Sequence, residues 1–196
     1  MKGIYLASYK ANHPKYDIIY QDINGKRDIA GDMLDIDLNP YDFIIATPPC
    51  NYWSRANYRR NTSKYSQQTK HLLPTIIDKL IELDKPFIVE NVRNQNLFKK
   101  YGLFNKNCFI YEHGRHTYWT NIAFNPSNIQ QINDFFAKNK RIPGKRGWFI
   151  TPEGKEVRSA GQNIQNLSKG NRQGGLNVKN VIDYWLEVVK ATPVYK

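Results

Sequence analysis

Continuous apolar runs in the first half of the chain predict buried β-strands. Short hydrophobic stretches bounded by turn residues occur at 3–8 (GIYLAS), 16–20 (YDIIY), 41–47 (YDFIIAT) and 85–92 (KPFIVENV). The last two are continuously apolar rather than alternating, which is typical of strands covered on both faces in a parallel sheet. The pattern therefore predicts an α/β domain built on such a sheet.

An amphipathic helix is predicted between the last two of these strands. Its apolar positions recur at helical spacing, with charged residues opposite them: Leu72, Leu73, Ile76, Ile77, Leu80 and Ile81. Pro74 stands at the front of this stripe and marks either the first helical turn or a kink. Strand, helix and strand in this order form a βαβ unit, whose crossover should be right-handed.

The second half of the chain is less regular. Residues 141–175 are rich in Gly, Asn, Lys and Arg and show little helical periodicity, so we expect loops and short strands there. A last helix is predicted at about 177–190, with an apolar face made of Val178, Val181, Ile182, Trp185 and Val189. We therefore expect an α/β domain over 1–125, a small basic lobe over 126–175, and a C-terminal helix within 176–196 that packs back on the domain.

The charge balance points to a polyanionic partner. The 196 residues include 29 Lys and Arg against 17 Asp and Glu, a net charge of +12. Such a surplus attracts nucleic acid backbones, although a soluble enzyme with a basic surface is the alternative. The two cysteines, Cys50 and Cys108, imply no disulfide framework, and no apolar run approaches a membrane span. We therefore expect a cytoplasmic protein that binds nucleic acid and makes no membrane contact.

Two chemically active side chains follow predicted strands. Cys50 comes three residues after the run that ends at Thr47, and Pro48 and Pro49 fix the backbone before it. Glu90 stands near the end of the next strand along the chain. Ligands of open α/β sheets bind at the carboxyl ends of the strands, so the thiol and the carboxyl group should meet as a nucleophile and an acid/base group. A buried structural cysteine and a structural bracket at ENV are the alternatives.

These motifs resemble those of the cytosine-5 DNA methyltransferase family. TPPC (47–50) and ENV (90–92), separated by the amphipathic helix, look like its two signature motifs. GRHTYWTN (114–121) looks like its later arginine-containing motif, and QGGLNVKNVIDYW (173–185) looks like its C-terminal Gly-Asn-Val helix. The resemblance implies a Rossmann-like methyltransferase sheet, with a target-recognition-like lobe at 126–175.

The resemblance also implies catalytic roles. The Cys50 thiolate would add to carbon 6 of a cytosine flipped out of the duplex. Glu90 would bind the base edge and protonate ring nitrogen 3, which makes carbon 6 more electrophilic. Arg115 would assist at the base carbonyl or steady the thiolate. S-adenosylmethionine would donate the methyl group.

The cofactor site departs from the family pattern. The resemblance assigns Asp22 or Asp32 to the ribose or adenine of S-adenosylmethionine, with Pro48 and Asn177 as further contacts, although each acid is equally well interpreted as a turn aspartate. The family's Asp-aromatic-Gly-Gly turn is not found, and about seven residues separate the first two apolar runs, too few for a Gly-rich turn and a crossover helix. We therefore expect a sheet reduced at the N-terminus, without the first strand and its cofactor turn. A second polypeptide could supply the missing half.

The stretch after Cys50 combines cationic and aromatic side chains. NYWSRANYRRNTSKYSQQ (51–68) interleaves Arg55, Arg59, Arg60 and Lys64 with Tyr52, Trp53, Tyr58 and Tyr65. Cations for phosphates and rings for stacking favour a loop that closes over DNA, with an ordinary solvated loop as the alternative. His113 and His116 are interpreted as surface histidines, because their spacing predicts no metal site.

Two functions are consistent with these motifs. The first is an active methyltransferase acting on DNA, or on RNA, which the family also permits. The second is a catalytically degenerate relative that binds nucleic acid or blocks a partner's site. Intact Cys50, Glu90 and Arg115 favour the first, and the missing cofactor turn favours the second. A compact modification enzyme would suit a phage or mobile element, or a restriction-modification system.

Overall fold

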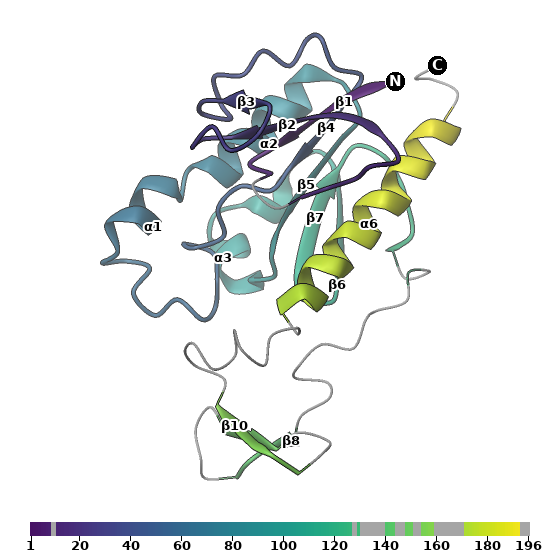
Figure 1. Ribbon diagram of the computed structural model, residues 1–196. Helices are drawn as coiled ribbons and strands as arrows, with labels where there is room; N and C mark the ends of the chain where they lie inside the picture. Colours follow the sequence, from purple (N-terminus) through teal and green to yellow (C-terminus); the bar gives the residue numbers. More distant parts are fainter. Residues whose placement is uncertain are drawn as a thin grey trace.

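The chain folds around one mixed β-sheet. The structure is a computed structural model that describes residues 1–8, 11–126, 129, 140–143, 148–150, 154–158 and 171–192. Within them, seven strands form one sheet in the order β3-β2-β1-β4-β5-β7-β6 (Figure 1). These strands are β1 (Lys2–Leu6), β2 (Asp17–Asp22), β3 (Ile29–Ala30), β4 (Phe43–Ala46), β5 (Phe87–Val92), β6 (Phe109–His113) and β7 (His116–Thr120). The strands from β3 to β5 pair in parallel, whereas β7 runs antiparallel to both β5 and β6.

The centre of the sheet is covered on both faces. All four residues of β4 and the first three of β5 are buried. Alternate residues face two different apolar clusters, because side chains of a strand point to opposite faces in turn. Ile44 and Val89 belong to one cluster, and Ile45 and Ile88 belong to the other. The prediction that these two runs are strands covered on both faces is confirmed.

One face of the sheet is covered chiefly by α2 (Leu72–Leu83). Its Leu73, Ile76, Ile77 and Leu80 are buried in the core, which confirms the predicted helix. Pro74 lies in its first turn, where a missing N–H leaves no hydrogen bond unmade. The shorter helices α1 (Lys64–Thr69), α3 (Gln95–Lys100) and η1 (Leu103–Asn105) complete this part of the chain.

The other face is covered by the C-terminal helix α6 (Asn171–Ala191), which crosses the sheet in Figure 1. Its buried residues Val181, Ile182, Trp185, Leu186 and Val189 share a cluster with buried side chains of the strands. Trp185 Nε1 also donates a hydrogen bond to Thr120 Oγ1 at 2.9 Å. The predicted helix is therefore confirmed, but it begins at Asn171 rather than near 177.

The connection between β1 and β2 corrects one sequence-based expectation. β1 lies inside the sheet and pairs in parallel with β2, although the connection spans only 7–16. The expectation that the first strand is missing is therefore wrong. The expectation that a crossover helix cannot fit holds for the described part of this connection, where no helix occurs. The N-terminal part of the chain is therefore shortened in the connection between β1 and β2, and not in the number of strands.

Side chains from the short connection fasten it to α6. His13 is buried, and its Nδ1 lies 2.6 Å from Asp183 Oδ1. Tyr16 Oη donates to Glu187 Oε1 at 2.5 Å. Burial lowers the pKa of His13 below its ordinary value, while the bond to Asp183 acts in the opposite direction. The helix at the far end of the chain therefore packs where the crossover is too short to form its own cover.

Few residues of the predicted basic lobe are described. A three-stranded antiparallel sheet is formed there by β8 (Lys140–Arg141), β9 (Trp148–Ile150) and β10 (Glu156–Arg158). Most of 126–175 lies outside the described residues, so the proposed domain boundaries stay a prediction. No helix in the described part of the chain is both long and apolar enough to cross a bilayer.

Candidate active site

Cys50 lies just beyond the carboxyl end of β4, in a turn held by contacts from both neighbouring strands. Thr47 N donates to the carbonyl oxygen of Leu6, after β4 has paired with β1. Asn91 Nδ2, from β5, donates to the carbonyl oxygen of Pro48 at 2.9 Å. The Cys50 side chain is exposed. A fixed turn therefore presents the thiol at the surface, as a nucleophile requires.

A second asparagine fixes the loop that follows Cys50. Asn94 caps α3, and its Nδ2 donates to the carbonyl oxygen of Trp53 at 2.6 Å. Ser54 N donates to Cys50 O at 2.8 Å. The structural bracket considered for ENV is therefore present, and Asn91 forms it together with the nearby Asn94.

We expect Asn91→Ala to lower the free energy of unfolding by about 1–3 kcal/mol, because the carbonyl of Pro48 loses its buried donor. Asn91 is 1% exposed, so water cannot easily replace the lost amide. Urea unfolding followed by fluorescence measures the change. Asn39→Ala is the matched control, since the Asn39 amide bonds only to exposed Asp37. Equal losses in both variants would show that Asn91 does not hold the turn.

Glu90 is a buried carboxylic acid with a raised pKa. Its side chain is 13% exposed, and burial raises its pKa to about 8. Tyr118 lies opposite Glu90 in the β5–β7 register and is fully buried. Burial raises the pKa of Tyr118 as well, and the nearby charge of Glu90 adds to this shift. Glu90 is therefore mostly protonated at neutral pH and can donate a proton.

The thiol is held in its neutral form when the site is empty of substrate. Desolvation and, second, the charge of Glu90 raise the pKa of Cys50. Cys50 and Glu90 line the same pocket, which places the two groups at the same end of the sheet. Glu90, which favours the protonated form of the thiol, is also the group that would bind the edge of a substrate base. Thiolate formation is thus coupled to what happens at Glu90.

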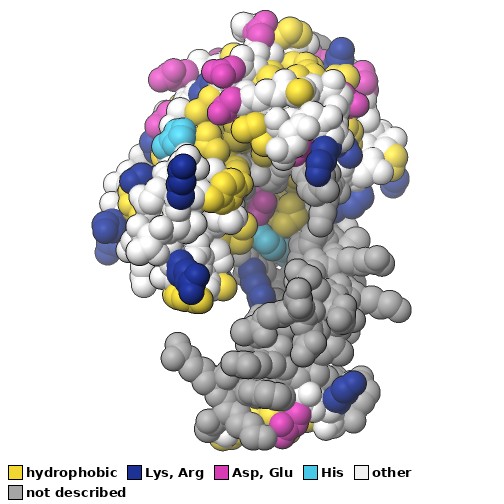
Figure 2. Space-filling model, turned by 60° about the vertical axis from the view of Figure 1, so that its left-hand side comes forward, with side chains coloured by type: hydrophobic (Ala, Val, Ile, Leu, Met, Phe, Trp, Pro, Cys, Tyr) yellow, Lys and Arg dark blue, Asp and Glu magenta, His cyan; other side chains and the backbone are white. Residues whose placement is uncertain are grey.

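Both groups line one pocket of about 550 Å³ at the carboxyl ends of the strands. Figure 2 shows this hollowed face, with acidic and histidine side chains inside the hollow. Asp22, Asp32 and Pro48 line the same pocket. The structure therefore brings together Cys50, Glu90 and three of the four residues assigned to the cofactor. Their roles stay predictions.

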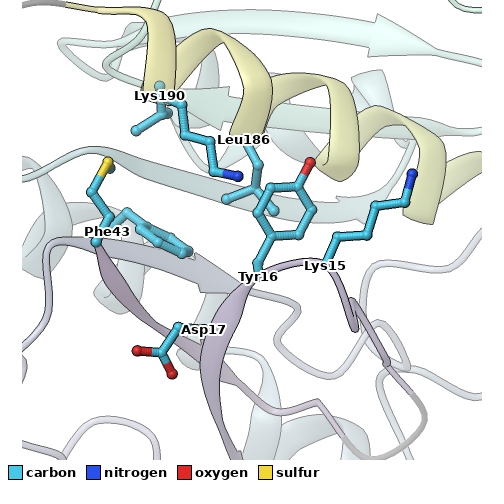
Figure 3. A pocket seen from close by; sticks show the side chains of 8 residues that line it. Lys15, Tyr16, Asp17, Phe43, Leu186 and Lys190 are labelled. Carbon is cyan, nitrogen blue, oxygen red and sulfur yellow. The ribbon is translucent and has the colours of Figure 1, made fainter.

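A second cavity of about 300 Å³ lies at the opposite edge of the sheet (Figure 3). Tyr16, Asp17 and Phe43 line it from the amino ends of strands, and Leu186 and Lys190 line it from α6. Ligands of open α/β sheets bind at the carboxyl ends, which this cavity does not reach. The larger pocket is therefore the candidate active site.

The backbone after β1 forms a turn that the sequence did not reveal. Ala7 has a φ of +58°, in the left-handed region that favours glycine. Ala7 N donates to Gln21 Oε1 at 2.7 Å, and Gln21 Nε2 donates to Gly31 O at 2.5 Å. Ala7 and Gln21 both line the pocket. A left-handed turn thus follows β1 without a glycine, and a side-chain amide holds it.

Two carboxylates at the pocket are anchored by their own loops. Asp22 Oδ1 accepts from Asn24 N at 2.8 Å, and Asp32 Oδ1 accepts from Leu34 N at 2.9 Å. Each is therefore a turn aspartate, as the alternative interpretation held, and each also lines the pocket. The two interpretations are compatible, because the turn fixes the carboxylate where a ligand could meet it. Asn177 lies in α6, where the structure describes the backbone but not this side chain.

Arg115 does not line the pocket, whereas its neighbour His116 does. Arg115 is exposed at the start of the turn into β7, and it is absent from the described residues that line the pocket. His116 Nε2 lies 3.7 Å from Glu90 Oε1. The interpretation of His113 and His116 as surface histidines is therefore wrong, since His113 is buried and the His116 side chain is 16% exposed. The strand pattern of HTYWT was the available signal, because it places His116 and Tyr118 on one face.

The aromatic residues after Cys50 divide into two groups. Tyr52 and Trp53 are buried in the core, so the expectation that they stack on nucleic acid is wrong. Trp53 packs on Phe98 at a ring distance of 5.8 Å. Tyr58 and Tyr65 are 86% and 51% exposed. These two rings alone, of the four considered, are available to bases.

The cations of 51–68 also divide. Arg60 is half-buried and donates to the carbonyl oxygens of Asn57 and Ser54, so it holds the loop itself. Arg55, Arg59 and Lys64 are exposed. The described residues contain no cluster of acidic, histidine or cysteine side chains that could hold a metal ion.

These features define a class of protein. The described residues form a mixed seven-stranded sheet with a thiol and a carboxylic acid at the carboxyl ends of its strands. This arrangement is a Rossmann-like methyltransferase fold. The family model of the C-5 cytosine-specific DNA methylases matches residues 5–109, which is more than half of the chain. The chain belongs to this family. No curated protein matches the chain significantly.

Proposed function

We propose that this protein is a DNA cytosine-5 methyltransferase in which Cys50 is the nucleophile and Glu90 the acid that activates the base. One observation carries the proposal: an exposed thiol and a protonated, buried carboxylic acid line the same pocket at the carboxyl ends of β4 and β5. A binding module would not need this pair. Membership of the methylase family supports cytosine in DNA as the substrate.

The residues support a complete catalytic cycle. Cys50 gives its S–H proton to solvent and its sulfur bonds to carbon 6, while Glu90 donates its own proton to ring nitrogen 3, which leaves carbon 5 nucleophilic. S-adenosylmethionine, when bound, supplies an electrophilic methyl group to carbon 5. Loss of the carbon 5 proton to solvent then allows the bond from carbon 6 to Cys50 to break. The proton on nitrogen 3 returns to Glu90, and the released Cys50 sulfur takes a proton from solvent, so both side chains regain their starting states.

The same pocket has groups that fit a nucleoside cofactor. The carboxylates of Asp22 and Asp32 are acceptors for ribose hydroxyl groups or an adenine amino group. Ile23 lines the same pocket, is 65% exposed and offers apolar contact to a purine. Pro48 lines the pocket beside Cys50, so a methyl donor held there would face the reacting base. We include Asn177 among the cofactor contacts on resemblance alone.

The nucleic acid would approach over the loop that follows Cys50. Exposed Arg55, Arg59 and Lys64 carry charges for phosphates, and the net charge of +12 adds a wider attraction. Tyr65 lies both at the surface and in the pocket lining. The target base must leave its stack to reach the pocket. The same assay covers two alternatives. In one the substrate is RNA rather than DNA, and in the other a partner polypeptide completes the cofactor site.

Methyl transfer from isotopically labelled S-adenosylmethionine to mixed DNA and RNA tests the proposal. We expect label in DNA, at cytosine, and heat on titrating the cofactor in the presence of DNA. Label in RNA alone would move the substrate to RNA. The alternative is a degenerate relative that only binds nucleic acid, and the short β1–β2 connection, whose described residues contain no helix, favours it. Salt-sensitive DNA binding with neither heat nor label would support that alternative and overturn the proposal.

We expect Tyr58→Ala to weaken binding of single-stranded DNA by about 1–3 kcal/mol, because the exposed ring can stack on a base. The fold should be unaffected, since Tyr58 is 86% exposed. Fluorescence anisotropy at fixed salt measures the affinity. Phe109→Ala is the matched control, because Phe109 is 48% exposed but lies on β6, outside the loop. Equal weakening by both substitutions would remove the stacking role.

A further inference from the structure

His116 lies beside Glu90 at the base of the candidate active site. In the β5–β7 register Tyr118 is opposite Glu90, and His116 is opposite Val92. Residues two apart on a strand share a face, so His116 lies next to Glu90 along the same side of the sheet. His116 Nε2 is 3.7 Å from Glu90 Oε1, and His116 lines the pocket together with Cys50.

The register of β7 explains why His116, and not Arg115, reaches this position. Arg115 precedes the strand, and its carbonyl oxygen accepts a hydrogen bond from Arg93 N at 2.7 Å. This backbone bond continues the pairing of β5 and β7 beyond Val92 and His116. Arg115 lies in the turn that precedes β7, where its side chain is exposed, whereas His116 is the first residue of the strand and lines the pocket.

The distance between the two side chains suits a shared ligand. At 3.7 Å, Nε2 and Oε1 are too far apart for a normal hydrogen bond, so each can bond to a different atom of one base. On a cytosine, ring nitrogen 3 lies between the C2 carbonyl and the C4 amino group. A protonated Glu90 that donates to nitrogen 3 can accept from the amino group, which leaves the carbonyl oxygen to a neighbouring donor. Imidazole Nε2–H is such a donor.

We infer that His116 donates a hydrogen bond to the C2 carbonyl oxygen of the cytosine that Glu90 binds, which is one of the two roles that the family resemblance implied for Arg115. The inference rests on the proposed function. Addition of Cys50 to carbon 6 pushes electron density toward nitrogen 3 and this oxygen. A fixed donor at the oxygen stabilises that charge as it develops, and it also distinguishes a pyrimidine carbonyl from an apolar ring edge.

Removing the carbonyl oxygen from the substrate tests the inference directly. The probes are two DNA duplexes of the sequence methylated best in the labelled assay, identical except at the target nucleotide. One carries cytosine, and the other carries a 2-aminopyridine C-nucleoside, which keeps the ring nitrogen and amino group but lacks the carbonyl. Affinities of the full chain and of its His116→Phe, His116→Gln and Arg115→Ala variants are measured by anisotropy.

We expect the wild-type chain to bind the carbonyl-free duplex about five- to a hundredfold more weakly, as for one lost hydrogen bond with a partner left unpaired. His116→Phe should bind both duplexes equally, His116→Gln should keep part of the preference through its amide donor, and Arg115→Ala should keep all of it. A structural role for His116 would weaken binding of both duplexes alike and would not abolish the preference.

Each other result overturns the inference. Equal binding of the two duplexes by the wild-type chain would do so without any variant, even if His116→Phe fails to fold. Loss of the preference in Arg115→Ala alone would return the role to Arg115. In both cases methyl transfer by the wild-type chain would leave the proposed function standing. A wild-type chain that methylates no nucleic acid overturns the proposed function and this inference together.

Discussion

Cys50→Ala is expected to lower methyl transfer by about 10⁴-fold or more, because Cys50 carries the only thiol among the described residues that line the pocket. The substitution should leave the fold intact, since the Cys50 side chain is exposed and its turn is held by backbone and Asn91 contacts. The measurement is covalent trapping on DNA that contains 5-fluorocytosine, followed by denaturing electrophoresis. The wild-type chain should give a shifted band, and Cys50→Ala should give none.

Cys108→Ala is the matched control for this experiment. Cys108 is half-buried between η1 and β6, and burial raises its pKa to about 11. It does not line the candidate active site within the described residues. We therefore expect Cys108→Ala to keep the adduct. An adduct that persists in Cys50→Ala, or that disappears in Cys108→Ala, would assign the nucleophile elsewhere.

The raised pKa of Cys50 gives this chemistry a particular order. In the free protein, partial desolvation of the Cys50 sulfur raises its pKa and keeps the thiol protonated, so simple alkylation should be slow at neutral pH. Once Glu90 has given its proton to a base, that proton is on the substrate and carbon 6 attracts the sulfur electrons. The thiol therefore reacts best when a correct base is present, which limits reaction with other electrophiles.

The buried part of the fold could be predicted because its sequence signal is unambiguous. β4 and β5 are continuous apolar runs, and α2 places four apolar residues on one face. β3 has only two residues, and β6 has only the short apolar run Phe109–Tyr111, so neither gives a strong strand signal in the sequence. The parallel pairing of β1 with β2 was missed because a crossover of 7–16 normally lacks room for the cover that a parallel sheet needs. Here α6 forms that cover, and sequence distance hides the contact.

The site was predictable where the chemistry depends on strand ends. Cys50, Glu90, Asp22 and Asp32 each follow or close a strand, and the topology brings all four to one pocket. The errors concern side-chain direction. The sequence around Trp53 is the same whether its ring packs on Phe98 or stacks on a base. Only the tertiary contacts distinguish the two cases. Whether Arg115 or its neighbour His116 reaches the pocket likewise depends on the exact register of β7.

The left-handed turn at Ala7 shows a different limit. A glycine at position 7 would have indicated a left-handed backbone conformation, whereas an alanine does not. The amide of Gln21 supplies the missing restraint from the neighbouring strand, through bonds to Ala7 N and Gly31 O. Such a restraint depends on a pair of residues on different strands. No local motif search can find it.

Glu90→Gln is expected to have the second large effect, on both catalysis and the pH dependence of stability. The amide cannot supply a proton to ring nitrogen 3, so methyl transfer should fall by about 10²–10⁴-fold. In the wild-type chain, activity should fall as pH rises through about 8, where Glu90 loses its proton. The residual activity of Glu90→Gln should lack this decline. Rates measured between pH 6 and 9 distinguish the two profiles.

Stability gives an independent test of the same pKa, without cofactor or DNA. Burial raises the pKa of Glu90 from 4.5 to about 8, so between these values the folded chain holds a proton that the unfolded chain has released. Unfolding then releases a proton, and the free energy of unfolding falls as pH rises, by up to about 1.4 kcal/mol per pH unit. This stabilisation is complete below pH 4.5 and is lost by about pH 8.

Glu90→Gln has no such proton, so urea unfolding at pH 5, 6.5 and 8 should show the wild-type chain losing stability relative to the variant. Glu82→Gln, at an exposed position on α2, controls for the loss of a carboxyl group and should follow the wild-type chain. Parallel pH profiles for the wild-type chain and Glu90→Gln would mean that Glu90 ionises normally, and the carboxyl group would then be a poor proton donor to the base at neutral pH.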